Sequence, residues 1–338
     1  MAVTTISGLN TQIGRNHLIN GEFSVAQRGA TITAPNDDVY TLDRWNLVSD
    51  GNDIVDVTQS TTVPTGGALK SIGLDVETAN KQFGIVQIIE AKNCTGLIGN
   101  EVTFSFKAKV SNVRLGDVRA GIIAWSSTAD SVTSDVVATY NDDANPTLAS
   151  NLTFENTPSD LGVTTSWVTY SVTATIDTGS TTNVVVWIGS VDSSTTAGDF
   201  LYITDCQLEI GPNTSSFERE DYGTTLARCF RYYYRIESGS DRVIAQGRAN
   251  TTSAAIVTIN FPVRMRGLPT MTDSGDTDFQ VGYPEAVAAV TEGFTMSRVH
   301  ADECIVFFTT AANLTAGHAI DLQMDGGGTR FVAFSAEL

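Results

Sequence analysis

The sequence predicts an all-β protein with an N-terminal antiparallel jelly-roll sandwich, a short connecting helix and a smaller C-terminal β-sandwich. Threonine occurs 45 times among the 338 residues, and its β-branched side chain suits a pleated strand better than a helix. Short apolar or alternating runs are separated by loops rich in Ser, Thr, Asn and Asp, and most of the chain shows no helical period. Many short strands joined by turn-rich loops are typical of sandwiches and jelly rolls.

The N-terminal strands follow from hydrophobic periodicity. Four segments are predicted as strands on this ground: Val102–Val110, Val168–Ile176, Asn183–Ile188 and Phe200–Ile210. In the first of them, Phe104, Phe106 and their alternate neighbours form an apolar face, while Lys107 and Lys109 fall on a face exposed to water. His17–Phe23 is predicted as a further strand, broken by the turn-forming dipeptide Asn20-Gly21.

The pattern changes at Gly211-Pro212. Apolar residues recur at helical spacing over Asp221–Arg235, with arginines toward its C-terminal end, so this segment is predicted as the connecting helix. Four later segments are predicted as strands: Ala254–Val263, Glu303–Thr310, Ala319–Met324 and Arg330–Ser335. The expected parts are an attachment segment (1–15), a jelly-roll domain (16–212), a linker with a helix (213–236) and a C-terminal β-sandwich tip domain (237–338).

The charge excludes some partners. The net charge is -18, and only the linker is locally basic, because residues 213–236 carry four arginines against three carboxylates. Without a basic block the chain cannot neutralise a phosphate backbone, so nucleic acid is not expected as a partner. No apolar run approaches the length of a membrane span, and no membrane insertion is expected. The spacing of the four cysteines matches no zinc or redox motif and predicts buried free thiols.

No catalytic constellation stands out. The three histidines, His17, His300 and His318, lie in three different regions, and no HExxH, GxSxG or Walker motif is present. Acidic pairs such as Asp37-Asp38 lie in turn-like segments, where solvated turns are the ordinary interpretation. The chain is therefore expected not to be an enzyme.

One tryptophan is a candidate for ligand binding. Aromatic rings can stack on the C–H faces of sugars while polar groups surround them. Trp125 precedes a long polar loop and is the tryptophan most open to exposure, although a place in the core is the alternative. Trp187 and Trp45 are expected to be buried.

A structural calcium is one hypothesis for a metal site, although no cofactor is expected to be required. Asn20–Phe23 and Tyr202–Asp205 resemble the first and last strands of carbohydrate-binding-module jelly rolls. That resemblance implies a calcium ion bridging the two ends through oxygen ligands, here Glu22 and Asp205. The alternative is that both are ordinary surface carboxylates.

The predicted helix also suggests an interface. Neighbouring residues on a helix lie about 100° apart, so Tyr232, Tyr233 and Tyr234 cannot share one face. Some of these rings are then expected to contact another copy of the chain. The predicted interface residues are Leu226, Phe230, Arg231, Tyr232, Tyr233 and Tyr234.

Four blocks of the chain resemble the tail fibre and receptor-binding proteins of tailed bacteriophages. Asn16–Trp45 shows the pattern N-x-L-I-N-x-x-F-x-x-x-Q-R-G followed by Y-T-x-D-R-W, and Gln207–Arg235 shows L-E-x-G-x-x-x-x-x-F-E followed by Y-x-x-x-L-x-x-C-x-R-Y-Y. Phe261–Thr270 and the terminal Ser335–Leu338 resemble the small C-terminal β-domain of the same proteins.

This resemblance implies a virion structural protein, made in the host cytoplasm and assembled as a homotrimer on the tail or exterior of the particle. Residues 1–15 are then expected to attach to other tail or capsid proteins, and the β-domains to contact a host-surface glycan or protein. Two alternatives stay open: a capsid or tail decoration protein, such as a head fibre, without receptor binding, and a tail-associated glycan depolymerase.

Overall fold

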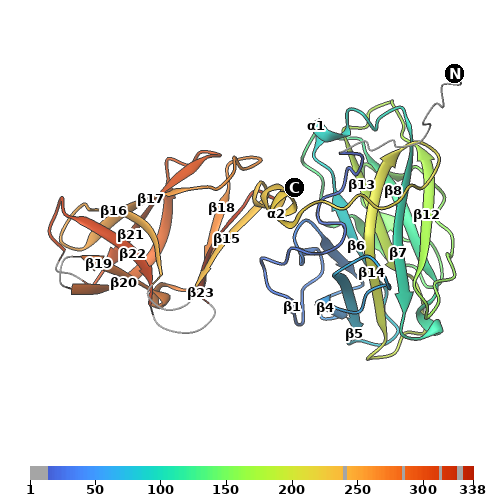
Figure 1. The fold of residues 1–338 in the computed structure, drawn as a ribbon, viewed down its shortest axis with the longest axis horizontal. Coiled ribbons are helices and arrows are strands. Elements are labelled where there is room, and N and C mark those ends of the chain that lie inside the picture. The colour runs from blue at the N-terminus through green and yellow to red at the C-terminus, as the bar shows by residue number, and fades with distance from the viewer. Residues whose placement is uncertain (1–13, 239–241, 284–285, 312–313, 326–329) are drawn as a thin grey trace, which may run out of the picture. The chain divides into compact units, whose positions relative to one another are not determined.

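The computed structural model describes residues 14–238, 242–283, 286–311, 314–325 and 330–338. The chain divides into two compact units, one of residues 1–222 with Leu338 and one of residues 223–337. The attachment segment expected at residues 1–15 lies outside the described residues except for Gly14 and Arg15. The all-β class predicted from the sequence is confirmed (Figure 1). None of the described helices is long and apolar enough to cross a membrane.

The first unit is a sandwich of two six-stranded antiparallel sheets. Sheet A has the order β1 (Thr31–Ile32), β4 (Val55–Ser60), β5 (Ser71–Val76), β14 (Phe200–Ile210), β7 (Glu101–Val110) and β12 (Val168–Thr175). Sheet B has the order β11 (Leu152–Phe154), β8 (Val118–Trp125), β13 (Asn183–Ser190), β6 (Phe83–Ile88), β3 (Asn46–Ser49) and β2 (Val39–Tyr40). A short helix, α1 (Ala91–Cys94), and a 3₁₀ turn, η1 (Val113–Leu115), lie between strands.

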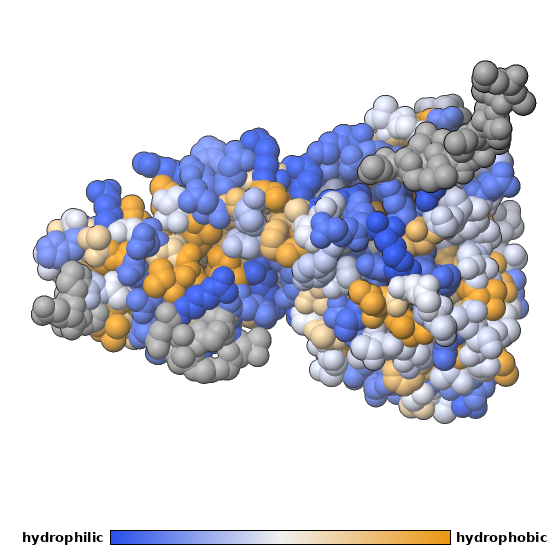
Figure 2. All heavy atoms as spheres, in the orientation of Figure 1, coloured by the Kyte–Doolittle hydropathy of each residue, from blue (hydrophilic) through white to orange (hydrophobic). Residues whose placement is uncertain are grey.

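The main core fills the space between the two sheets. On β7, Phe104, Phe106, Ala108 and Val110 are buried, whereas Lys107 and Lys109 are only half-buried. The alternation also predicts Thr103 and Ser105 on the exposed face, but both are buried. The prediction is therefore confirmed only in the second half of the strand, at Lys107 and Lys109. All four cysteines are buried and free, as their spacing predicted. Figure 2 shows the first unit as mainly pale or blue in this view, with orange in small separate areas, in keeping with its hydroxyl-rich composition.

The expected strand over His17–Phe23 does not form. Asn20 and Phe23 have φ angles of 58° and 55°, which break an extended chain. The backbone of Ile19 bonds instead to the side chain of Gln87, through N–H···Oε1 at 2.7 Å and Nε2–H···O at 2.8 Å. At Gly21 an added Cβ would lie 2.1 Å from the carbonyl oxygen of Cys206, so the Asn-Gly turn packs tightly against β14.

The second unit begins with α2 (Tyr222–Phe230) and contains a closed barrel where the sequence predicted a sandwich. The barrel order is β16 (Val243–Ala249), β17 (Ala254–Asn260), β21 (Glu303–Thr310), β20 (Ala286–Ser297), β19 (Phe279–Tyr283) and β22 (Ala319–Met324). A 3₁₀ turn, η2 (Asp276–Asp278), precedes β19. A separate sheet pairs β15 (Tyr233–Ser238), β23 (Arg330–Ser335) and β18 (Thr270–Asp273). Closure removes the sheet edges that a sandwich of this size would leave.

The helix is shorter than predicted. It ends at Phe230, and Tyr233 and Tyr234 instead pair with Ser335 and Phe334 of β23. Aromatic residues favour strands, and pairing with β23 satisfies their backbone groups. Tyr232 and Tyr233 are buried, and Tyr234 packs against Phe230 and Phe334. The tyrosine run is therefore not helical, and the helical argument for a contact with another copy does not apply to it. The interface itself stays a prediction.

The outer face of sheet B is covered. A second apolar cluster on this face includes Trp125, Trp187 and Tyr140, together with residues of the long segment 126–156 that carries β9 (Val137–Thr139) and β10 (Thr147–Leu148). Trp187 is fully buried, and its ring lies close to Gly84 and Gly189, where added Cβ atoms would lie 2.7 Å from indole atoms. Sheet B is thus packed on both sides.

Replacing Trp187 tests this cover. We expect Trp187→Ala to lower the free energy of unfolding of the first unit by about 3–5 kcal/mol, because the indole leaves a cavity that the surrounding strands cannot close. Trp167→Ala, a change of the same size at a half-buried position, is the matched control, with an expected loss below about 1 kcal/mol. Urea unfolding followed by far-UV circular dichroism measures both. Equal losses would contradict the assignment of Trp187 to a covered core.

Candidate functional site

The outer face of sheet A carries an aromatic strip, defined as Phe200, Tyr202 and Trp167 with Lys109. The rings of Phe200 and Tyr202 are stacked, with centroids 5.3 Å apart and an interplanar angle of 4°. The ring of Trp167 lies 6.5 Å from that of Tyr202, and Lys109 Nζ lies 5.7 Å from the Tyr202 centroid. All four side chains are half-buried. Such a strip offers apolar ring faces beside a polar group that can hydrogen-bond.

Strand register places the strip on the outer face. Leu201 and Ile203 of β14 point into the core, so Phe200 and Tyr202 between and beside them point outward. Tyr202 is paired with Gly73 on one side and Lys109 on the other. A Cβ at Gly73 would lie 3.2 Å from the Tyr202 ring, so this glycine leaves room for the ring.

Polar groups border the strip. Burial raises the pKa of Tyr202, and the negative charge of Asp75 raises it further. A hydrogen bond with Thr62 lowers this pKa and opposes both effects. The pKa of Asp75 is itself raised by burial and by the nearby carboxylates of Glu77 and Asp56. One oxygen of Asp75 has no hydrogen-bond partner among the described residues. The strip thus has a positive side at Lys109 and an acidic side at Asp75.

A hollow of about 280 Å³ adjoins the strip at the next row of β7 and β12. Its lining residues are mostly small or polar and come from β7, β12, β14 and two loops: Gly66, Gly67, Ser105, Phe106, Lys107, Thr169, Asp205, Thr214, Ser215, Ser216, Phe217 and Arg219. The strip and the hollow together form one continuous candidate binding surface on sheet A.

The two carboxylates of the calcium hypothesis do come together, but they bind cations of the chain. Arg219 Nη1 lies 2.5 Å from Glu22 Oε2, and its Nη2 lies 3.0 Å from Asp205 Oδ1. Lys107 Nζ lies 2.9 Å from Asp205 Oδ2. Burial is the main cause that raises the pKa of Glu22, and Arg219 opposes it. Within the described residues, no group of three or more His, Cys, Asp or Glu side chains could hold a metal ion.

The donor set therefore does not fit calcium. A guanidinium already spans the two carboxylates, and a divalent cation in the same place would face two positive charges. Arg219 also lies 5.3 Å from the ring centroid of Phe217, so the linker itself supplies the cation and supports it.

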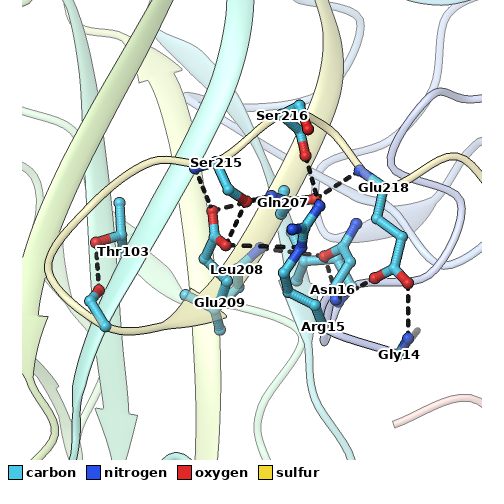
Figure 3. Close-up of polar contacts among 12 residues, drawn as sticks. Gly14, Arg15, Asn16, Thr103, Gln207, Leu208, Glu209, Ser215, Ser216 and Glu218 are labelled. Atoms are coloured by element: carbon cyan, nitrogen blue, oxygen red, sulfur yellow. Dashed lines mark hydrogen bonds and ion pairs between the residues drawn. The ribbon is translucent and has the colours of Figure 1, made fainter. Parts of the chain in front are cut away.

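A second polar cluster, shown in Figure 3, fastens the start of the described chain and the linker to β14. Glu218 accepts hydrogen bonds from the backbone N–H groups of Gly14 at 2.6 Å and Asn16 at 2.8 Å. Glu209 is buried and accepts from the N–H and hydroxyl of Ser215 at 2.8 and 2.5 Å. Asn16 belongs to one of the two motifs that resemble phage tail proteins, and Glu209, Ser215 and Glu218 belong to the other, so these parts of both motifs have a structural role.

Trp125, the ligand-binding candidate, is part of the covered core. Its side chain is 6% exposed and its indole N–H donates to the carbonyl of Thr128 at 2.9 Å. A polar loop follows Trp125 in the sequence, and for that reason exposure was expected. In the structure this loop folds back over sheet B and buries the ring. The predicted interface residues Leu226, Phe230, Arg231 and Tyr234 are half-buried, whereas Tyr232 and Tyr233 are buried.

The acidic pair Asp37-Asp38 is not a plain solvated turn. Asp37 accepts from the N–H of Ser49 at 2.6 Å. Burial, with Asp37 and Asp135 nearby, raises the pKa of Asp38 to about 7. Asp38 precedes β2 at the edge of sheet B and is no part of the strip on sheet A.

No family model matches the chain, and no curated protein matches it in sequence. Among solved structures, the enzymatically active domain of bacteriophage CBA120 tailspike protein 4 is similar over 58% of this chain and 22% of that chain, at 15% identity and a TM-score of 0.35. A CBM4 structure is similar over 57% and 98% of the two chains, at 16% identity and a TM-score of 0.31. The CBM22-1 xylan-binding domain of Paenibacillus barcinonensis Xyn10C is similar over 56% and 99%, at 14% identity and a TM-score of 0.30. At these TM-scores the likeness does not assign the chain to a family.

Removing the Arg219 guanidinium should destabilise the first unit. Arg219→Ala leaves the buried Asp205 with Lys107 alone and removes the ion pair of Glu22, and we expect a loss of about 1–3 kcal/mol in the free energy of unfolding. Arg248→Ala, an exposed arginine of the barrel, is the control and should leave stability unchanged. Because the chain supplies its own cation, neither EDTA nor added calcium should shift the melting temperature of the parent protein. A rise with calcium would show that a metal competes with Arg219.

The raised pKa of Asp38 gives a pH test with a defined sign. Between the unfolded pKa of about 4 and the folded pKa of about 7, the folded chain binds more protons at Asp38 than the unfolded chain. This contribution to stability therefore falls as the pH rises through that window. We expect Asp38→Asn to stabilise the protein at pH 8 and to lose this advantage toward pH 4.

Asp143→Asn is the matched control for Asp38→Asn. Asp143 has a similar positive φ of 55°, against 59° for Asp38, and asparagine tolerates this conformation. Hydrogen bonds from Ser193 lower its pKa, so its replacement should destabilise at pH 8. Thermal melts of both variants across pH 4–8 measure the effect. A uniform shift of the Asp38→Asn melting curve at all pH values would contradict the buried, protonated assignment.

Proposed function

We propose that the chain is a non-enzymatic adhesion protein of a bacteriophage particle, a tail fibre or receptor-binding protein, that binds a host-surface glycan through the aromatic strip of sheet A. The observation that carries the glycan part is the strip itself: two rings on β14 and one directly before β12, with Lys109, Asp75 and the hollow beside them. Sugars present C–H faces to such rings and hydroxyls to the polar groups around them.

The phage setting is supported by the sequence resemblance in Asn16–Trp45 and Gln207–Arg235. The homotrimer belongs to the same proposal and is supported by the same sequence resemblance alone. Tyr232 and Tyr233 are buried within the chain, so they add no separate support. Sedimentation of the purified protein tests it directly: a stable species of one 36.0 kDa chain at micromolar concentration would contradict the trimer.

Rings on the strip should carry the glycan affinity. On an array of bacterial surface glycans, we expect Tyr202→Ala and Trp167→Ala each to weaken binding at least about tenfold, because each change removes a stacking face. Tyr222→Ala, an aromatic residue that is 57% exposed on α2, is the matched control and should bind as the parent does. Binding that is unchanged in both strip variants would contradict the assignment of the strip.

The absence of catalysis is tested on the same glycans. The parent protein should release no reducing ends on prolonged incubation with the glycan that binds best. Asp56 and Asp75 are paired across β4 and β5 beside the strip, so they are the carboxylates to replace first if reducing ends do appear.

A further inference from the structure

The outer surface of the barrel holds a hollow of about 510 Å³ over β16, β22, β19 and the start of β20. On β22, Ile320 and Leu322 are buried in the core, so Asp321 and Gln323 point outward. Asp321 is paired with Gln246 of β16 on one side and Gly282 of β19 on the other. Gly282 is paired in turn with Val287 of β20. One row of paired residues across four strands therefore contains the amide of Gln246, the carboxylate of Asp321, the bare backbone of Gly282 and the apolar side chain of Val287.

Gly282 has no side chain, and this absence forms the floor of the hollow and gives the Gln323 side chain its place at one wall. A Cβ at Gly282 would lie 2.5 Å from Nε2 of Gln323, so the Gln323 side chain lies across the place that any other residue would fill. The lack of a side chain at Gly282 lowers the floor between Asp321 and Val287.

Hydrogen bonds fix the polar side of the hollow. Gln246 Nε2 donates to Asp321 Oδ1 at 2.9 Å, and Gln280 Nε2 donates to Gln323 Oε1 at 3.3 Å. These bonds leave the NH₂ group of Gln323 and the second oxygen of Asp321 with no partner among the described residues. A donor and an acceptor are thus held in adjacent, outward-facing positions, an arrangement that suits neighbouring hydroxyls of a ligand.

The opposite side of the hollow is apolar. Val287 is 61% exposed, and Tyr283 and Ala319 also line the hollow. Among the described residues that line the hollow, Asp321 is the only charged one, so an anionic ligand would meet a like charge there and gain no cation from these residues. The volume falls within the range of about 300–1,000 Å³ typical of small-ligand sites.

We propose that this hollow is a second glycan site, which binds one or two units of a neutral hexopyranose through Asp321, Gln246 and Gln323, with Val287 and Tyr283 against the C–H face. This site uses none of the residues of the aromatic strip. It stands or falls independently of the function proposed for sheet A.

The test uses the full ¹⁵N-labelled chain carrying Tyr202→Ala, so that binding at the strip does not interfere. The probes are the methyl β-glycosides of glucose, galactose and mannose, with methyl β-glucuronide as the acidic counterpart. We expect at least one neutral glycoside, at tens of millimolar, to shift the side-chain NH₂ signals of Gln246 and Gln323, and the glucuronide to shift them less.

Variants separate the site from general surface binding. Asp321→Asn and Gln323→Ala should each weaken the neutral glycoside about tenfold, through loss of an acceptor or a donor. Glu303→Gln is the matched control, because β21 lies three strands away from β22 in either direction around the barrel. Retention of dispersed amide signals shows that each variant is folded. The proposal is wrong if no neutral glycoside shifts the two NH₂ signals, if the glucuronide binds more tightly, or if the folded variants bind as the parent does.

Discussion

The first unit is organised by a difference in burial: sheet B is buried on both faces, and sheet A is fully buried on only one. Sheet B is buried on both faces: one face packs on the main core, and the other lies under the segment 126–156 that closes over Trp187. Sheet A packs on the core with one face. The linker covers part of its other face, where Gln207 and Glu209 are buried, and Lys107, Lys109 and Tyr202 stay half-buried. A β-sandwich offers two broad surfaces, and the segment over sheet B leaves only that of sheet A partly open.

The linker shapes that remaining surface. Arg219 spans Glu22 and Asp205, and Glu218 holds the backbone of Gly14 and Asn16, so the chain that leaves β14 is fastened back onto the same strand. This return path forms one wall of the hollow beside the aromatic strip. In a chain with a net charge of -18, the linker arginine takes the place where a metal ion was expected between two carboxylates.

Much of the fold was open to prediction from the sequence. The alternation in Val102–Val110 and the continuous apolar run in Asn183–Ile188 gave β7 and β13 within two residues at either end, because burial on one or both faces leaves a direct trace in the pattern. The turn at Asn20-Gly21 was also foreseen, but the strand around it was not formed. Its backbone bonds go to the Gln87 side chain, and a side-chain partner far along the chain leaves no local signal.

The candidate site was hidden for a related reason. Trp167 and Tyr202 meet only through the pairing of β12 and β14 with β7, and β14 contains a register shift between Thr204 and Gln207. The alternation of Trp167, Thr169 and Ser171 could have indicated an outward face of this strand. It does not tell which residues of other strands lie beside that face. Trp125 attracted attention because a polar loop follows it, yet that loop folds back as the cover.

The central claim, that the open face of sheet A is where a glycan binds, is tested most directly by a crystal structure of the protein with the oligosaccharide that binds it most tightly. The structure should show a sugar ring against Tyr202 and Trp167, with hydroxyl groups within hydrogen-bond distance of Lys109 or Asp75. A sugar bound only elsewhere on the first unit, with the strip left to solvent, would contradict the claim.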